Sequence, residues 1–337
     1  MRLVVTGVAG FIGMHTALRL LQMGHEVIGV DNLNDYYDPQ LKLDRLAQIE
    51  GQPGFRFEPL DIAATGALDG LVDEVRPQRL VHLAAQAGVR HSIDHPMDYV
   101  TANLVGFMNV LEACRQHAIE HLVYASSSSV YGNNSAIPFS EHHAVDHPLS
   151  IYAASKRANE LMAHVYSHLH GLPTTGLRFF TVYGPWGRPD MAPILFARAI
   201  EAGQPIAVFN FGKHQRDFTY IDDIVSGVVA VACGSLPKGQ KAVNDEVDPA
   251  ASKAPWRIYN IGNNQPVQLM DFLAELQHCL GKPAHLEMKP AQPGDVLDTW
   301  ADCSDLQRDF DYHPDTRLAD GMQQFTDWFK KYYSNKG

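Results

Sequence analysis

The sequence predicts an α/β fold, in which a doubly wound parallel sheet is followed by a smaller C-terminal α/β domain. Three observations predict this fold. A short apolar run at residues 3–5 leads through a glycine-rich turn into a helical apolar pattern. Strand and helix patterns then alternate as far as residue 180, as in parallel sheets whose crossover connections are helices. After residue 181 turn-forming residues become frequent and the alternation becomes irregular.

The turn after the first strand has the residues of a nucleotide-binding turn. Its glycines and the apolar residues that open the next helix are Gly7, Gly10, Phe11, Ile12 and Gly13. Glycine lets the backbone approach a pyrophosphate, and a helix N-terminus offers free N–H groups. A plain tight turn also uses glycine, and Val8 replaces the second glycine of the common fingerprint. However, a second strand at 26–30 ends in Asp31, whose carboxylate can bind both hydroxyls of an adenosine ribose. We therefore expect a Rossmann-type dinucleotide site.

The rest of the first half continues the alternation. Strands are expected at 55–59, 79–83, 122–125 and 174–180, and helices at 41–49, 68–75, 98–117 and 151–170. Asp61 follows the third strand, where it would either meet an adenine amino group or cap a helix. Small residues after the fourth strand would let the chain pass close to a cofactor. The further candidate cofactor contacts are Asn32, Asp61, Ile62, Ala84, Ala85 and Asn103.

Composition limits the classes of function. The chain has 337 residues, 45% of them hydrophobic, with a formal net charge of −11, which disfavours nucleic acid as a partner. No apolar run approaches the length of a membrane helix, and no charged-then-apolar leader opens the sequence, so we expect a cytoplasmic protein without a membrane partner. The four cysteines are widely spaced and are expected to be reduced. His142, His143 and His147 cluster without helical spacing, and no metal site is expected.

The second half is expected to form a smaller domain that closes over the first. The boundary falls near residue 178, giving domains 1–178 and 179–337, with segments 217–233 and 256–264 as candidates for return to the main sheet. Short strands are expected at 206–209, 216–221 and 257–261, and a polar surface loop at 235–255. A final helix carries an apolar stripe that includes Phe325 and Phe329.

A tyrosine and a lysine in the helix 151–170 suggest proton transfer. Tyr152 and Lys156 are four residues apart and share a helix face. A free tyrosine has a pKa near 10, but a nearby ammonium favours the phenolate, which makes the pair a plausible base for a hydroxyl proton. Without other evidence, a tyrosine and a lysine at this spacing usually belong to a solvated helix face. Four hydroxyls at residues 126–129, at the end of a parallel strand, support the functional interpretation.

The chain resembles the extended short-chain dehydrogenase/reductase family, within its nucleotide-sugar epimerase branch. The resemblance covers nearly the whole chain and lies in the segments TGVAGFIG, Asp31, Asp61-Ile62, HLAA, SSSSVYG, YAASK and RDFTYIDD. The segment LRFFTVYGPWGRPDMA is similar to that typical of UDP-glucuronate 4-epimerases. The resemblance implies that Tyr152 is the base, that Lys156 activates it and binds the nicotinamide ribose, and that Ser127 bonds the reacting hydroxyl. It also implies bound NAD, which Asp31 favours because a carboxylate repels a 2′-phosphate.

The resemblance further implies a set of substrate contacts. These are Ser127, Ser128, Ser129, Thr181, Arg188, Ala207, Phe209, Arg216 and Asp295. Arg188 would grip a sugar carboxylate in a bidentate manner, although a surface loop arginine is the simpler alternative. Ser128 and Ser129 stand where dehydratases of the family carry an Asp-Glu pair. Thr181 replaces the usual asparagine of galactose epimerases, and Gln292 replaces an arginine near Asp295, which leaves that contact open.

The expected activity is the NAD-dependent, reversible 4-epimerisation of UDP-glucuronate to UDP-galacturonate through a 4-keto intermediate. The alternatives are a 4-epimerase of another UDP-hexose, such as glucose or an N-acetyl form, a nucleotide-sugar reductase that consumes external cofactor, and a non-catalytic NAD-sensing protein. The resemblance also implies a homodimer formed through the helices at 98–117 and 151–170.

Overall fold

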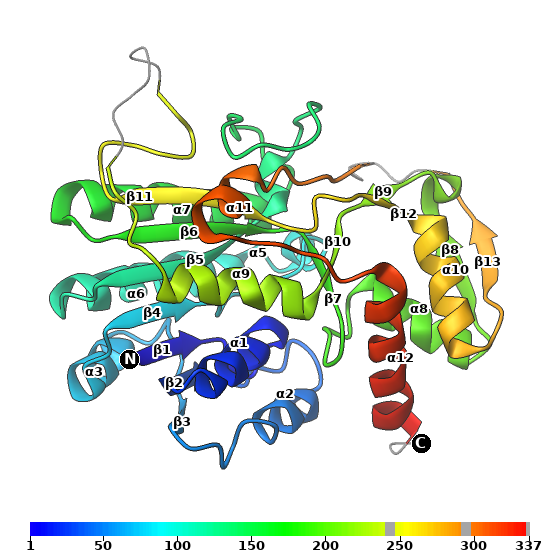
Figure 1. Ribbon diagram of the computed structural model, residues 1–337, viewed down its shortest axis with the longest axis horizontal. Coiled ribbons are helices and arrows are strands. Elements are labelled where there is room, and N and C mark those ends of the chain that lie inside the picture. Colours follow the sequence, from blue (N-terminus) through cyan, green and yellow to red (C-terminus); the bar gives the residue numbers. More distant parts are fainter. Residues whose placement is uncertain (240–246, 291–297, 335–337) are drawn as a thin grey trace.

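The computed structural model describes residues 1–239, 247–290 and 298–334, and its centre is a parallel sheet of seven strands (Figure 1). In spatial order the strands are β11 (Trp256–Ile261), β6 (Thr174–Phe179), β5 (His121–Ser127), β4 (Arg79–His82), β1 (Arg2–Thr6), β2 (Glu26–Asp31) and β3 (Phe55–Pro59). The chain order reverses between β1 and β4, where open parallel sheets bind ligands beyond the carboxyl ends of their strands. The predicted α/β class and its doubly wound sheet are confirmed.

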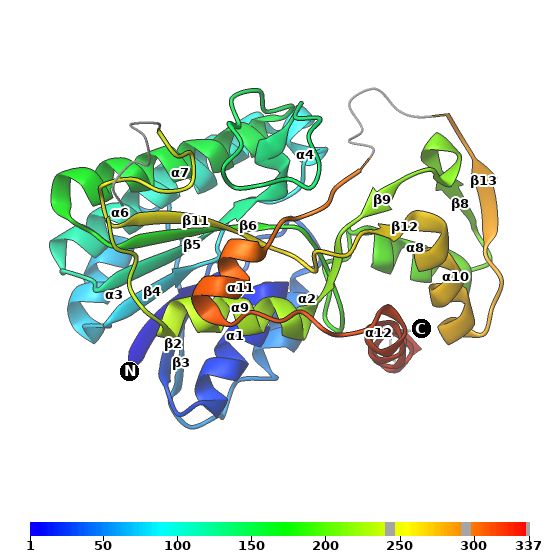
Figure 2. The same ribbon diagram turned by 45° about the horizontal axis from the view of Figure 1, so that its top comes forward.

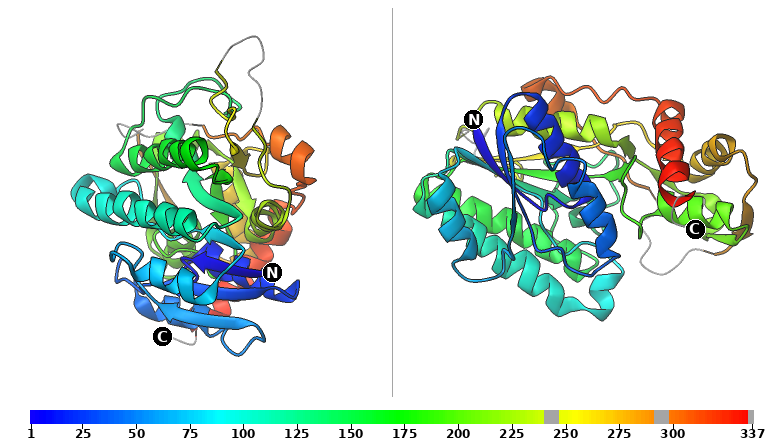
Figure 3. Two further views of the ribbon diagram at one scale, coloured as in Figure 1. Left: turned by 90° about the vertical axis from the view of Figure 1, so that its left-hand side faces the viewer. Right: turned by 90° about the horizontal axis from the view of Figure 1, so that it is seen from below.

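Helices cover both faces of this sheet (Figure 3). One face carries α3 (Ala67–Val75), α6 (Gly106–Gln116) and α7 (Ile151–His170), and the other carries α1 (Phe11–Gln22), α2 (Pro39–Leu46), α9 (Ile221–Cys233) and α11 (Ser304–Phe310). Side chains of β1 alternate between the faces: Leu3 and Val5 join the core beneath α1 and α9, and Val4 joins the core beneath α3 and α6. Because both faces are buried, β1 reads as a continuous apolar run.

The helix expected at 98–117 is interrupted. It consists of α5 (Pro96–Tyr99), the π-helical turn η1 (Val100–Val105) and α6, preceded by the short helix α4 (His91–Asp94). The wider π turn supports a contact with a neighbouring helix, since the carbonyl of Asn103 accepts a hydrogen bond from Asn159 Nδ2 at 2.7 Å. The apolar stripe alone did not distinguish this geometry from a regular helix.

The second half adds a smaller α/β layer beside the sheet (Figure 2). Its strands form three pairs: β7 (Thr181–Tyr183) with β10 (Phe218–Tyr220), β8 (Pro205–Val208) with β13 (His285–Met288), and β9 (Gln215–Arg216) with β12 (Val267–Gln268). Its helices are α8 (Ala192–Glu201), α10 (Leu269–Leu280) and α12 (Leu318–Ser334), and it contains a short 3₁₀ turn, η3 (Phe209–Gly212). In the first half, the 3₁₀ turn η2 (Ser128–Tyr131) follows β5.

Two late segments lie against the first half of the chain. β11 pairs in parallel with β6 along its whole length, and α9 packs on α1. The strand expected at 216–221 is divided between β9 and β10 at Asp217. This buried carboxylate accepts hydrogen bonds from the backbone N–H groups of Asn263, Asn264 and Ala301 and therefore interrupts the strand. No helix in the described parts of the chain has both the length and the apolar character needed to span a membrane.

Candidate functional site

The glycine turn between β1 and α1 leaves no room for side chains. Gly7 has φ +74°, and a Cβ there would lie 2.6 Å from the backbone nitrogen of Ala84. A Cβ on Gly13 would lie 2.0 Å from the carbonyl oxygen of Gly7, and one on Gly10 would lie 2.9 Å from the same oxygen. Gly10 begins α1 without a side-chain cap, so the first N–H groups of the helix stay available to a ligand. The turn therefore fits the pyrophosphate of a dinucleotide.

Acidic and amide side chains lie beside this turn, at the ends of β2 and β3. Asp31 is buried and accepts hydrogen bonds from the N–H groups of Ala9 at 3.1 Å and Leu33 at 2.9 Å. Burial raises the pKa of Asp31, against these hydrogen bonds and the charge of Lys42. Asn32 donates to Asp61 at 3.3 Å. The alternative that Asp61 caps a helix is wrong for α3, because α3 begins at Ala67 with Gly66 at its N-cap.

The segment after β4 passes directly over the glycine turn. Ala84 donates its N–H to Thr6 Oγ1 at 3.2 Å, and Ala85 follows it. Asn103 is buried, and its amide is already engaged by the backbone of Gln86 at 2.8 and 3.0 Å and by Ser155 Oγ at 3.0 Å. Asn103 thus holds the segment after β4 against α7. The other predicted cofactor contacts here, Phe11 and Ile62, are buried, and Ile12 is partly buried.

Tyr152 and Lys156 lie in the first two turns of α7, facing the end of β5. Lys156 is 2% exposed and donates from Nζ to the carbonyl of Ala125 at 2.9 Å. Burial lowers the pKa of Lys156 to about 8. Burial raises the pKa of Tyr152, while a hydrogen bond with Ser127 and the charge of Arg188 act to lower it. Arg188 is thus one cation whose charge acts on the phenol, and the spacing of Tyr152 and Lys156 did not suggest it.

The four serines at the end of β5 have different environments. Ser126 is buried and donates to Glu160 Oε1 at 2.6 Å, so it faces away from Tyr152. Ser127 Oγ accepts hydrogen bonds from the backbone and hydroxyl of Ser129, at 3.2 and 2.9 Å, and thereby begins η2. Ser128 and Ser129 are partly exposed within this turn. The hydroxyl that meets the phenol belongs to Ser127, as the extended conformation predicts.

The turn after β7 brings Arg188 close to Tyr152. It is held from the other half of the chain by Arg45, a fully buried residue of α2. Arg45 donates to the carbonyl of Trp186 at 2.7 and 3.0 Å, to that of Gly187 at 3.1 Å, and to that of Ala9 in the glycine turn at 3.2 Å. The charge of Arg188 acts on Tyr152, so the guanidinium lies within electrostatic range of the phenol.

Sequence reasoning missed several residues that organise this site. They are Tyr36, Arg45, Tyr99, Glu160, Arg178 and Asp190. Glu160 and Arg178 are both 0% exposed and form a bidentate ion pair at 2.9 and 3.0 Å. The spacing Tyr152, Lys156, Glu160 repeats every fourth residue, and this signal places all three on one helix face. Polar residues of loops, such as Tyr36 and Asp190, carry no comparable signal.

The remaining predicted substrate contacts lie in the second half. Thr181 begins β7, Ala207 lies in β8, Phe209 begins η3 and Arg216 ends β9. Asp295 and Gln292 lie outside the described residues. Thr181, Ala207, Phe209 and Arg216 thus lie in the smaller layer and not in the central sheet.

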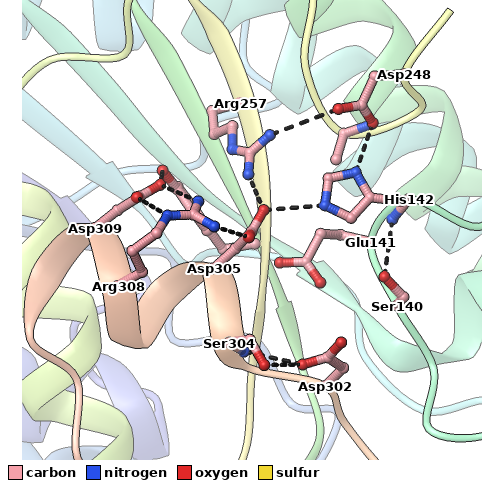
Figure 4. Close-up of polar contacts among 12 residues, drawn as sticks. Ser140, Glu141, His142, Asp248, Arg257, Asp302, Ser304, Asp305, Arg308 and Asp309 are labelled. Atoms are coloured by element: carbon pink, nitrogen blue, oxygen red, sulfur yellow. Dashed lines mark hydrogen bonds and ion pairs between the residues drawn. The ribbon is translucent and has the colours of Figure 1, made fainter. Parts of the chain in front are cut away.

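A charge cluster joins the loop before α7 to the late part of the chain (Figure 4). His142 lies between Asp248 and Asp305, with ring nitrogens 2.8 and 3.0 Å from their carboxylates. Hydrogen bonding to Asp305 and Asp248 raises the pKa of His142 to about 9. Arg257 also pairs with Asp305, and Arg308 donates to it at 2.6 Å. The cluster fastens the loop at 133–150 to α11 and β11.

His91, His95 and Asp98 are the three residues in the described part of the chain that come close enough together to hold a metal ion. Two of them are exposed, and the rings of His91 and His95 stack at 4.3 Å with an angle of 16°. A ring nitrogen of His91 also lies 3.3 Å from a carboxylate oxygen of Asp98.

Comparisons of the chain with a family model, with known proteins and with solved structures all found similar proteins. A model of the NAD dependent epimerase/dehydratase family matches residues 3–243. Protein CapI of Staphylococcus aureus is 50% identical over 333 residues, which are 99% of each chain. A probable UDP-glucuronate 4-epimerase of Rhizobium meliloti is 44% identical over 336 residues, covering 99% of this chain and 98% of that protein. The solved UDP-glucuronic acid 4-epimerase from Bacillus cereus, in complex with UDP-glucuronic acid and NAD, has a TM-score of 0.87 at 33% identity, covering 99% of this chain and 100% of that one.

Proposed function

The chain belongs to the NAD dependent epimerase/dehydratase family, and on this premise we propose that it is a UDP-glucuronate 4-epimerase. It interconverts UDP-glucuronate and UDP-galacturonate through a 4-keto intermediate. The observation that carries this proposal is the guanidinium of Arg188 within electrostatic range of the phenol of Tyr152, because only a uronate offers a carboxylate next to the reacting carbon.

The cofactor is NAD. The glycine turn at Gly7, Gly10 and Gly13 fits its pyrophosphate, since a Cβ at any of these positions would meet backbone atoms. Asp31, at the end of β2, is placed to bind the adenosine ribose and disfavours a 2′-phosphate. Held there, NAD would supply the redox chemistry of the cycle, as an acceptor and then a donor of hydride at C4 of the sugar.

Tyr152 takes the proton from the 4-hydroxyl and later gives it back to the 4-oxygen. Ser127, which faces the phenol, orients that hydroxyl. Lys156 stays fixed by Ala125 and contributes positive charge near the base and the ribose of the nicotinamide. Burial raises the pKa of Tyr152, so positive charge near the phenol is needed to bring its proton affinity toward the working range.

Substrate contacts divide between the two layers. Arg188, Ser128, Ser129 and Thr181 surround the sugar, and the uridine diphosphate lies along the smaller layer. Its contacts are Ala207, Phe209, Arg216 and Asp295. We therefore divide the chain by function into a nucleotide-cofactor domain at 1–178 and a UDP-sugar domain at 179–337, with 217–233 and 256–264 returning to the first.

The protein is also proposed to act as a cytoplasmic homodimer formed by the outer faces of α6 and α7. Leu161, Val165 and Leu169 form an exposed apolar stripe on α7, with 48–66% of each residue accessible. Met108 is exposed on the adjacent α6. A stripe of this kind on neighbouring helices favours burial against a second copy. Sedimentation equilibrium tests this, and a monomer at micromolar concentration contradicts it.

The test of the function is to incubate the NAD-loaded protein with UDP-glucuronate, UDP-glucose and UDP-N-acetylglucosamine and to resolve the products by anion exchange. UDP-glucuronate should yield UDP-galacturonate without consumption of added NADH or NADPH. If the protein instead converts UDP-glucose or UDP-N-acetylglucosamine, it is an epimerase of another UDP-hexose. If it consumes added NADH or NADPH, it is a nucleotide-sugar reductase. Arg188→Ala should lower kcat/KM for the uronate about ten- to a hundredfold and leave neutral UDP-hexoses nearly unaffected. Equal losses on both would exclude the carboxylate role.

A further inference from the structure

The guanidinium of Arg188 is held along one edge by an acid of its own turn. Nε donates to Asp190 Oδ1 at 3.1 Å, and Nη2 donates to Asp190 Oδ2 at 2.5 Å. Tyr36, in the loop after β2, donates its phenolic hydrogen to the same Oδ2 at 3.1 Å. A guanidinium has five N–H donors in two edges, so the two hydrogens of Nη1 and the second hydrogen of Nη2 are not taken up by Asp190.

Tyr36 is itself fixed by the segment after β4. A Cβ on Gly88 would lie 2.5 Å from the phenolic oxygen of Tyr36, and Gly88 has φ +104°. The carbonyl of Gly88 accepts a hydrogen bond from Tyr99 at 2.5 Å, and the ring of Tyr99 meets the ring of Tyr152 edge-on at 6.0 Å. Tyr36 therefore lies between the turn that carries Arg188 and the Gly88–Tyr99 pair next to the proposed base.

The protonation states favour this arrangement at neutral pH. Burial and the neighbouring Asp190 raise the pKa of Tyr36, so the phenol keeps the hydrogen that it donates. Burial acts to raise the pKa of Asp190, but Arg188 and Tyr36 outweigh it and hold that pKa below its ordinary value. Asp190 is therefore ionised, and its bond to Arg188 is charge-assisted.

We infer that Asp190 and Tyr36 are positioning residues that preset Arg188, so that its outer Nη1–Nη2 edge receives the carboxylate of the sugar. This inference rests on the proposed function, because it assigns a partner to the same arginine. A long, free arginine loses much rotamer freedom on binding, and a guanidinium already held on one edge loses less. Uronate selectivity then depends on Asp190 and Tyr36 as well as on Arg188. The opposing idea is that Asp190 competes with the substrate for Arg188.

Binding measurements separate the two ideas. NAD-loaded protein carrying Tyr152→Phe, which prevents turnover, is titrated with UDP-glucuronate and with UDP-glucose by calorimetry. Asp190→Asn should weaken UDP-glucuronate binding about ten- to a hundredfold, and Tyr36→Phe about three- to tenfold, with UDP-glucose unchanged. If Tyr36 acts through Asp190, the double variant should bind no more weakly than Asp190→Asn alone. Asp35→Asn, which removes an exposed charge from the same loop as Tyr36, is the matched control and should leave both affinities unchanged.

Three results overturn the inference: tighter uronate binding in Asp190→Asn, equal losses for both sugars, or additive losses in the double variant. Turnover is measured separately in the presence of Tyr152. If that protein fails to epimerise UDP-glucuronate while the affinity ratio falls as expected, the proposed function fails and the positioning role stands. If it epimerises the uronate and Asp190→Asn leaves the ratio unchanged, the positioning role alone fails.

Discussion

The buried carboxylate of Glu160 should be among the most stabilising single groups in the protein. It lies on α7, one turn beyond Lys156, and accepts four hydrogen bonds. These come from Arg178 Nε at 2.9 Å and Nη2 at 3.0 Å, Ser126 Oγ at 2.6 Å and Arg157 Nη1 at 3.0 Å. The substitution Glu160→Gln keeps the size of the side chain but removes its charge and turns one oxygen into a donor.

The expected loss follows from these contacts. A glutamine amide retains one accepting oxygen, so two of the four donors would face an N–H₂ group instead. Arg178 is 0% exposed and would keep its charge without a counterion. Removing one partner of a buried ion pair costs about 3–5 kcal/mol of unfolding free energy. Because Glu160 also joins α7 to β5 through Ser126, we expect Tyr152 to shift and turnover to fall as well.

Urea unfolding followed by circular dichroism and by tryptophan fluorescence measures this loss. The matched control is Glu74→Gln, which breaks an exposed pair with Arg56 at 2.7 Å. Exposed pairs contribute about 0–1 kcal/mol, so the control should change little. If Glu160→Gln costs no more than Glu74→Gln, the reasoning about the buried pair is refuted.

Three further predictions concern the cofactor, the base and the loop before α7. Gly13→Ala should abolish NAD binding, because the new Cβ would lie 2.0 Å from the carbonyl oxygen of Gly7. The measurement is the amount of NAD that stays bound on purification. A variant that retains NAD contradicts the proposal that this turn binds the pyrophosphate. Tyr152→Phe should retain NAD but lose about 10²–10⁴-fold in kcat, and a near-normal rate would remove it from the mechanism. His142→Gln should lower the unfolding free energy by about 1 kcal/mol near neutral pH, after allowance for solvent screening. Because the folded-state pKa of His142, about 9, lies above its ordinary 6.5, this stabilisation is complete below about pH 6.5 and is lost as pH rises through 9; a urea-midpoint difference that does not change with pH would contradict it.

Much of the central sheet could be predicted because its signals are local. The run at Leu3–Val5, the glycine turn and the acid at the end of the next strand lie within about thirty residues, and each has a direct physical consequence. The helix at Ile151–His170 was predicted with its observed bounds, since Ser150 caps it and Gly171 ends it.

Elsewhere the decisive contacts come from distant segments. The π turn around Asn103 depends on Asn159, fifty-six residues later, and the break at Asp217 depends on backbone groups at 263, 264 and 301. The apolar pattern around each was correct, but the partner that changes the backbone cannot be read from the segment itself.

The residues of the candidate site likewise include some with a local signal in the sequence and some whose role depends on distant segments. Tyr152, Lys156 and Ser127 carry a recognisable spacing, and the structure brings the three together. Arg45 and Asp190 carry none, because a buried arginine in a short helix and an acid in a loop look like ordinary surface residues in the sequence. The effect of Arg188 on Tyr152 also required the fold, since thirty-six residues separate them.

The pairing of β11 with β6 has a consequence for synthesis on the ribosome. When β6 has emerged, one of its edges has no neighbour, and α1 has not yet met α9. The missing strand is translated roughly 80 residues later, which at about 5–20 residues per second means a delay of several seconds. During that interval the nascent chain presents an open strand edge and an apolar helix face, so its first half is the part most exposed to pairing with other chains.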